Sequence, residues 1–226
     1  MLMKKVYLAF AAVLAVSTLI LSGCNKETSF ESQPQEEFSE MSDISKILYL
    51  LKQEGITTSE EGANYMANVC GTSIPMTKGN AGYIFDDSAY ENVSMEAATI
   101  ISNFQNVTIN EDDTEQSVKE RFYSILDGGN LDKNSDEYIN LKLAIDYSFE
   151  LFEYLAEENQ IETKASKFWQ TVGYVAKCVA GTVGSAGLGG LAGAGAGTVT
   201  LPVVGTVSGA AVGAVCGGLV GASTFC

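Results

Sequence analysis

The 226-residue chain contains no histidine, and it has 13 lysine and arginine residues against 28 aspartate and glutamate residues. The absence of histidine excludes histidine-based acid–base catalysis and histidine-ligated metal sites. The net charge of −15 argues against nucleic acid as a partner, because phosphate binding requires a basic surface. The five cysteines include no Cys-x-x-Cys pair, which disfavours zinc knuckles and thioredoxin-type motifs. We therefore expect no metal, no cofactor and no enzymatic activity.

Charge is also missing from residues 178–226, which contain no Asp, Glu, Lys or Arg and are rich in Gly, Ala, Val and Thr. A small residue stands at every fourth position from 181 to 221, except at Leu201. On a helix such positions share one face, which allows a second backbone to approach closely. The helix-packing candidates form two runs in the same phase: Gly181, Ser185, Gly189, Gly193 and Gly197, then Gly205, Gly209, Gly213, Gly217 and Gly221.

The two runs predict a helical hairpin within residues 167–226. Residues 178–200 and 203–226 are each long enough, as helices, to cross a hydrocarbon core of about 30 Å. Pro202 suits the first turn of the second helix, with Thr200 as its cap. Glycine costs about 1 kcal/mol relative to alanine in a helix in water, whereas lipid forces the backbone to bond internally. We expect the hairpin to insert in or pack on a membrane and self-associate; the alternative is a soluble hairpin buried against the rest of the chain.

The N-terminus has the features of a secretory signal, with Lys4 and Lys5 followed by an apolar run over 6–21. The next residues, Leu21-Ser22-Gly23-Cys24, closely resemble the lipobox of bacterial lipoproteins. The resemblance implies removal of residues 1–23 and attachment of acyl chains such as palmitate to Cys24. Several acyl chains anchor a protein stably, where a single chain binds reversibly. The alternative is an ordinary N-terminal anchor with a chance cysteine.

The residues after Cys24 bear on location. Asn25 resembles the outer-membrane default of enterobacterial lipoproteins, and Lys26-Glu27 loosely resembles the surface-export signals of Bacteroidetes lipoproteins. Together they imply an outer-membrane lipoprotein of the cell envelope, with the periplasmic and surface faces both open. Residues 24–40 are polar and carry little apolar surface, so we expect a flexible tether.

Residues 41–166 predict a small acidic helical domain. Apolar residues recur at helical spacing in five segments, 44–51, 63–69, 97–104, 118–126 and 139–155. Expected helix starts are Ser94, Thr114 and Ser135, and expected stops are Gly55 and Gly128-Gly129. Residues 72–91 predict a loop with a short extended piece at 83–85. The predicted fold is mostly α, an acidic helical domain followed by a glycine-rich helical hairpin.

Three patterns in this domain suggest chemistry only weakly. Glu111-Asp112-Asp113 precedes a helix, where acidic residues complement the helix dipole. The alternating oxygens of 130–136 resemble a calcium loop, but Ser135 and Leu141 replace its glycine and glutamate, so a helix connection is favoured. Asp87-Ser88-Ala89 is similar to the acceptor motif of Bacteroidetes O-glycosylation.

Four cysteines remain if Cys24 is lipidated, and they allow three pairings. Reflection of the chain about Leu201-Pro202 places Cys178 opposite residues 225–226, so Cys178 and Cys226 are a candidate disulfide at the open end of the hairpin. Cys70 and Cys216 are then left over. Cys216 would lie within the second helix as a small apolar residue.

The tail resembles glycine-zipper segments of bacterial envelope lipoproteins and of pore-forming peptides, and the two-peptide bacteriocins that carry Gly-x-x-x-Gly. The leading interpretation is a cell-envelope lipoprotein with a structural or interaction role, whose partners are the lipid membrane and a second copy of the chain or an envelope protein. The alternative is a bacteriocin-like, membrane-permeabilising toxin whose acidic domain shields the tail. A third interpretation is a lipoprotein whose middle domain binds a ligand.

Overall fold

The computed structural model describes residues 38–70, 76–79, 82–85, 91, 93–110, 112–158 and 176–226. The chain divides into two compact units, Met1–Ser39 and Glu40–Cys226, and only the second is considered below. This unit is mostly helical, which confirms the predicted fold class. Its elements, in chain order, are α3 (Asp43–Gln53), α4 (Ser59–Cys70), β1 (Met76–Gly79), β2 (Gly82–Phe85), α5 (Met95–Gln105), α6 (Glu115–Gly128), α7 (Asp136–Glu158), α9 (Ala176–Ala194), β3 (Thr198–Leu201), β4 (Gly205–Ser208) and α10 (Gly209–Phe225).

The helix starts predicted in the acidic domain are confirmed by side-chain caps. The Ser94 hydroxyl accepts a hydrogen bond from the backbone N–H of Ala97, which satisfies one of the free donors at the start of α5. At α6, Thr114 and Ser117 form a reciprocal capping box. The Ser135 hydroxyl accepts from the N–H of Tyr138 at the start of α7.

Gly55 ends α3 as predicted. Its φ of +67° is a conformation that glycine adopts without steric cost. This conformation lets the N–H of Gly55 donate to the Lys52 carbonyl and the N–H of Ile56 donate to the Leu51 carbonyl. These two bonds are the Schellman pattern, which satisfies carbonyls that the end of a helix would otherwise leave free.

The link between the two C-terminal helices differs from the prediction. Residues 198–208 form an antiparallel hairpin in which Val199 pairs with Val207. The expectation that Pro202 would open the second helix is wrong, because Pro202 lies in the turn between β3 and β4, and α10 begins seven residues later with Ser208 as its cap. The physical reason is a two-residue alternation that buries Val199, Leu201 and Val207 and exposes the threonines between them.

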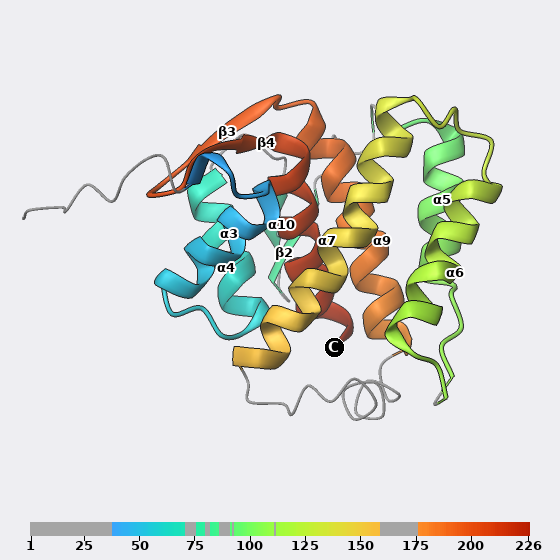
Figure 1. Cartoon of the computed structure of the whole chain (residues 1–226), viewed down its shortest axis with the longest axis horizontal. Helices are drawn as coiled ribbons and strands as arrows, with labels where there is room; N and C mark the ends of the chain where they lie inside the picture. The colour runs from blue at the N-terminus through green and yellow to red at the C-terminus, as the bar shows by residue number, and fades with distance from the viewer. Residues whose placement is uncertain are drawn as a thin grey trace, which may run out of the picture. The chain divides into compact units, whose positions relative to one another are not determined.

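The helix α10 lies at the centre of the unit (Figure 1). It packs on α9 along its length and also contacts α3, α4 and α7, while α9 contacts α7 and α5. In Figure 1, α3 and α4 lie on one side of α10, and α5 and α6 lie on the other side of α9. Between α5, α6 and α7, the rings of Phe104, Phe122 and Phe149 meet edge to face at 5.5 and 6.3 Å between centroids.

The structure does not separate the helices at the domain boundary expected at residue 166. The helices on both sides of that boundary belong to the same compact unit. The residues at the boundary itself, 159–175, are outside the described part of the chain. The glycine-rich hairpin therefore contributes the interior of the helical domain and is not a second domain beside it.

Candidate functional site

The glycine-rich hairpin is the most distinctive feature of the structure, and its two glycine faces pack on each other. A Cβ atom placed on Gly213 would overlap the carbonyl oxygen of Gly189, and one placed on Gly217 would overlap the carbonyl oxygen of Ser185. A Cβ on Gly221 would lie 2.8 Å from the Cα of Thr182, closer than such atoms approach in proteins. The two helices therefore touch backbone to backbone, as small residues at a shared face allow.

The end of the hairpin next to β3 and β4 is packed in the same way. Gly193 and Gly209 face each other so tightly that a Cβ on either one would overlap the carbonyl oxygen of the other. Near the open end, Gly181 is covered by the ring of Phe225 instead of by backbone. The glycine ladder thus has its packing partner within the same chain.

Two of the glycines predicted to pack helices do not do so. Gly197 and Gly205 lie outside α9 and α10, and a Cβ on either would meet no atom within 4 Å. Both have positive φ values, +69° and +80°, at the two ends of the β3–β4 hairpin. Their role is conformational, because glycine turns the chain there without a side-chain clash.

Cys178 and Cys226 form a disulfide at the open end of the hairpin, with 4.7 Å between their Cα atoms. This is the pairing suggested by reflecting the sequence about Leu201-Pro202. The bond joins the first turn of α9 to the residue after α10, across 48 positions of sequence. Both ends of the hairpin are therefore closed, one by the β3–β4 connection and the other by a covalent bond.

The hairpin is enclosed by acidic helices. Every residue of α10 from Ala211 to Ala222 is buried. Leu219 of α10 fills the space beside Gly62 of α4, and Leu151 of α7 fills the space beside Gly218. Of the helices in the described part of the chain, none is both long and apolar enough to cross a membrane. The structure thus has the packed arrangement that the sequence offered as the alternative to a membrane-inserted hairpin.

A carboxylate of the acidic domain holds the start of α10. The backbone N–H of Ser208 donates to Oδ2 of Asp43 at 2.9 Å, and Asp43 itself lies in the first turn of α3. One negative charge therefore lies at the positive ends of two helix dipoles. Burial, followed by the charge of Asp43, raises the pKa of the nearby Tyr147 to about 12.

Two polar features inside the core were not anticipated from the sequence. The hydroxyl of Thr182 in α9 is fully buried and has no hydrogen-bond partner among the described residues. Cys216 is buried in α10 as expected, and its sulfur faces that of Cys70 at 3.8 Å. No sequence signal links these two cysteines, because they stand 146 residues apart and meet only through the packing of α4 on α10.

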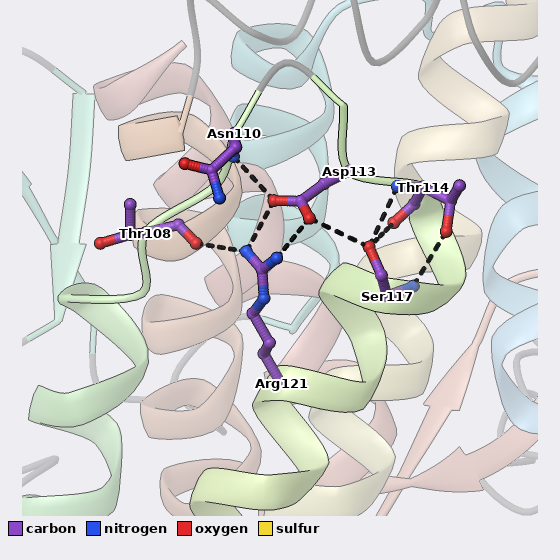
Figure 2. A network of polar contacts seen from close by, with 6 residues as sticks. All are labelled: Thr108, Asn110, Asp113, Thr114, Ser117 and Arg121. Carbon is purple, nitrogen blue, oxygen red and sulfur yellow. Dashed lines mark hydrogen bonds and ion pairs between the residues drawn. The ribbon is translucent and has the colours of Figure 1, made fainter.

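The acidic cluster before α6 connects the preceding segment to this helix through hydrogen bonds and an ion pair. Figure 2 shows Arg121 reaching from α6 to the carboxylate of Asp113 and to the carbonyl of Thr108. Asp113 also accepts from the backbone N–H of Asn110 at 2.7 Å and from the Ser117 hydroxyl. The hydrogen bond from Arg121, followed by that from Asn110, lowers the pKa of Asp113. Glu111, the first member of the predicted cluster, is outside the described residues.

The calcium-like pattern at 130–136 forms a helix connection. Asp132 accepts hydrogen bonds from the backbone and side chain of Asn134, so its carboxylate is engaged within the turn. Across the described ranges, no group of three or more His, Cys, Asp or Glu residues is placed to hold a metal ion.

A groove of about 750 Å³ lies between α5 and α6, with polar lining from Asn103, Asn106, Ser124 and Asn130.

Some predicted sites lie outside the described residues. They are the lipidation site Cys24 and the tripeptide Asp87-Ser88-Ala89.

The site that the structure describes is a helical hairpin closed by glycine packing and a disulfide, inside an acidic helical domain. In comparisons with known proteins, the chain matches no family model, no curated sequence and no solved structure.

Proposed function

We propose that this chain is a cell-envelope lipoprotein with a structural or interaction role, held at the outer membrane by lipids on Cys24. The observation that carries the proposal is the packing of Gly213 on Gly189. Because this contact is made within the chain, the glycine zipper serves as the rigid interior of the domain. Attachment to the membrane then falls to Cys24, through the polar tether of residues 24–40.

The acidic surface supports an interaction role. The net charge of −15 keeps such a domain soluble and repels the anionic phosphates of lipid and nucleic acid. A partner would therefore be an envelope protein with a basic face. The groove between α5 and α6 offers amide and hydroxyl groups and the carboxylate of Glu96 to such a partner.

Metabolic labelling of the full chain with a palmitate analogue tests the anchor. The wild-type chain should be labelled and should stay in the membrane fraction after an alkaline carbonate wash. The variant Cys24→Ala should lose the label and leave the membrane fraction, while its helical circular dichroism is retained. Retention of unlabelled Cys24→Ala in the washed membranes would show that the apolar run 6–21 or the hairpin anchors the chain without lipid, and the proposal would be wrong.

A second candidate, a membrane-permeabilising toxin, is favoured by one observation. The disulfide joins Cys178 to Cys226, and no disulfide among the described residues joins the hairpin to α3, α4 or α7. Apart from the backbone that leads to it from α7, the hairpin is therefore a covalently closed unit held in the acidic domain by non-covalent packing. In this function the domain shields the apolar hairpin until it is released.

Trypsin provides a sharp test of the toxin function, because residues 178–226 contain no lysine or arginine and Lys177 stands directly before them. Digestion of the unfolded chain thus leaves the closed hairpin in one piece. The toxin function predicts dye leakage from phosphatidylethanolamine–phosphatidylglycerol vesicles with this fragment and none with the intact chain. Vesicles that stay sealed in the presence of the fragment would rule the function out.

A further inference from the structure

The two cysteines outside the hairpin disulfide form a second close pair. Cys70 is the last residue of α4, and Cys216 lies in the middle of α10. Their sulfur atoms are 3.8 Å apart, which is van der Waals contact. The residues are 4% and 1% exposed, so the pair lies in the interior between the two helices.

The packing around this pair holds the sulfurs together. Helices α4 and α10 are in extensive contact, and Leu219 of α10 occupies the space beside Gly62 of α4. The remaining cysteines of the described region, Cys178 and Cys226, are already bonded to each other. A disulfide bond is about 2.05 Å long, so bonding requires the two sulfurs to approach by about 2 Å. Each of the two thiols therefore has only the other as a thiol neighbour, and a small shift would bring the two sulfur atoms to bonding distance.

We propose that Cys70 and Cys216 are oxidised to a second disulfide, which joins α4 of the acidic domain covalently to α10 of the hairpin. The oxidant is a small-molecule or protein disulfide, and the reaction is thiol–disulfide exchange. The Cys70 thiolate attacks one sulfur of the oxidant, which releases one thiolate and leaves a mixed disulfide on Cys70. The Cys216 thiolate then attacks the Cys70 sulfur and releases the second thiolate. The protons lost by the two cysteines are taken up by the two released thiolates, so two thiols are oxidised and one disulfide is reduced.

The order of attack follows from the surroundings of the two sulfurs. The hydrogen bond with Cys216 lowers the pKa of Cys70, whereas the same bond and complete burial raise the pKa of Cys216. Cys70 also stands at the end of its helix, while Cys216 is covered by neighbours on both sides in α10. Exchange thus begins at Cys70 when the end of α4 opens, and Cys216 resolves the mixed disulfide.

This bond changes what a cut in the backbone can do. Without it, cleavage before Cys178 leaves the hairpin held only by packing. With it, residues 178–226 stay attached to α4 through Cys216. Where the second candidate function applies, the thiol pair would decide whether the hairpin can leave. The existence of the bond itself does not depend on that function.

The test uses the full chain carrying Cys24→Ala, in which Cys70 and Cys216 are the free thiols. The folded protein is treated with oxidised glutathione, quenched, unfolded and digested with trypsin without reduction. Peptide 53–78 contains Cys70, and peptide 178–226 contains the other three cysteines. We expect the two peptides to appear as one disulfide-linked mass, and maleimide-reactive thiols in the unfolded chain to fall from two to none. We also expect the melting temperature to rise by about 5 to 10 °C.

The variants Cys216→Ala and Cys70→Ala distinguish this bond from disulfide exchange with the hairpin. Neither variant should give the linked mass, while both should retain the Cys178–Cys226 bond within peptide 178–226. The proposal is overturned if both thiols of the folded protein stay reactive after oxidation, or if glutathione remains on Cys70 without resolution. It is also overturned if Cys216→Ala still yields the linked peptides, because Cys70 would then pair with Cys178 or Cys226.

Discussion

Gly213 of α10 faces the carbonyl oxygen of Gly189 in α9 with no room for a Cβ atom between them. This contact decides what the glycine ladder does. A ladder that joined two copies of the chain would leave its face open in a single chain, whereas here the face is filled. The function of the ladder can therefore be tested by stability measurements on the monomer.

Gly213→Ala should destabilise the fold by about 2 to 3 kcal/mol, because the added methyl group forces two backbones apart. Gly190→Ala is the matched control in α9. A Cβ on Gly190 would lie 3.6 Å from the Cβ of Ala214, an ordinary contact, and alanine is favoured in a helix by about 1 kcal/mol. Urea denaturation should show loss of stability in the first variant and no loss in the second. Equal effects would mean that the glycine contact is not tight.

The turn between β3 and β4 contains a strained residue. Val203 has φ +66°, and the N–H of Val204 donates to the Pro202 carbonyl across it at 2.7 Å. Positive φ is costly for a β-branched residue, so Val203→Gly should stabilise the fold by about 1 kcal/mol. The control is Thr206→Gly in the exposed face of β4, which should destabilise because glycine weakens strands. Thermal unfolding of both variants measures the contrast.

Thr182 presents a buried hydroxyl without a described partner. Thr182→Val replaces that hydroxyl by a methyl group of the same shape, and we expect a gain of about 1 kcal/mol. Thr182→Ser keeps the hydroxyl and removes the methyl group, so it should destabilise the fold. If Val proves worse than Thr in denaturant unfolding, the hydroxyl has a partner and the expectation is wrong.

The Asp113–Arg121 pair predicts a pH effect. A carboxyl group whose pKa is lowered in the folded state contributes stability above its ordinary pKa, and this stability is lost as the pH falls through the folded pKa. Arg121→Gln removes the largest cause of the lowered pKa of Asp113. The variant should therefore be less stable than wild type at pH 7, with a difference that shrinks on acidification below pH 4. In an Asp113→Asn background the same substitution should show no such pH dependence, because the amide at position 113 does not titrate.

Much of the acidic domain could be predicted because its signals are local. Ser94 and Thr114 cap helices through atoms three residues away, and Gly55 terminates α3 through its own φ. The sequence shows such features directly. The glycine ladder was equally visible, but its partner was not, because a smooth helix face permits close packing without specifying what packs on it.

The β3–β4 connection was hidden by the same ladder. Gly197 and Gly205 continue the four-residue spacing in the sequence, although their positive φ values place them at turns. The four-residue spacing of the glycines overlaps there with the two-residue alternation of Val199 and Leu201. The glycine spacing therefore hid the strand pattern. The contact of Cys70 with Cys216 depends on the packing of α4 on α10, and no local pattern carries it.

The central place of α10 has a consequence for how the domain is made. This helix follows every other described element in the chain, and yet it supplies the interior against which α3, α4, α7 and α9 pack. During synthesis α3, α4, α7 and α9 emerge with the faces that pack on α10 uncovered, so this part of the core forms only after α10 has been made.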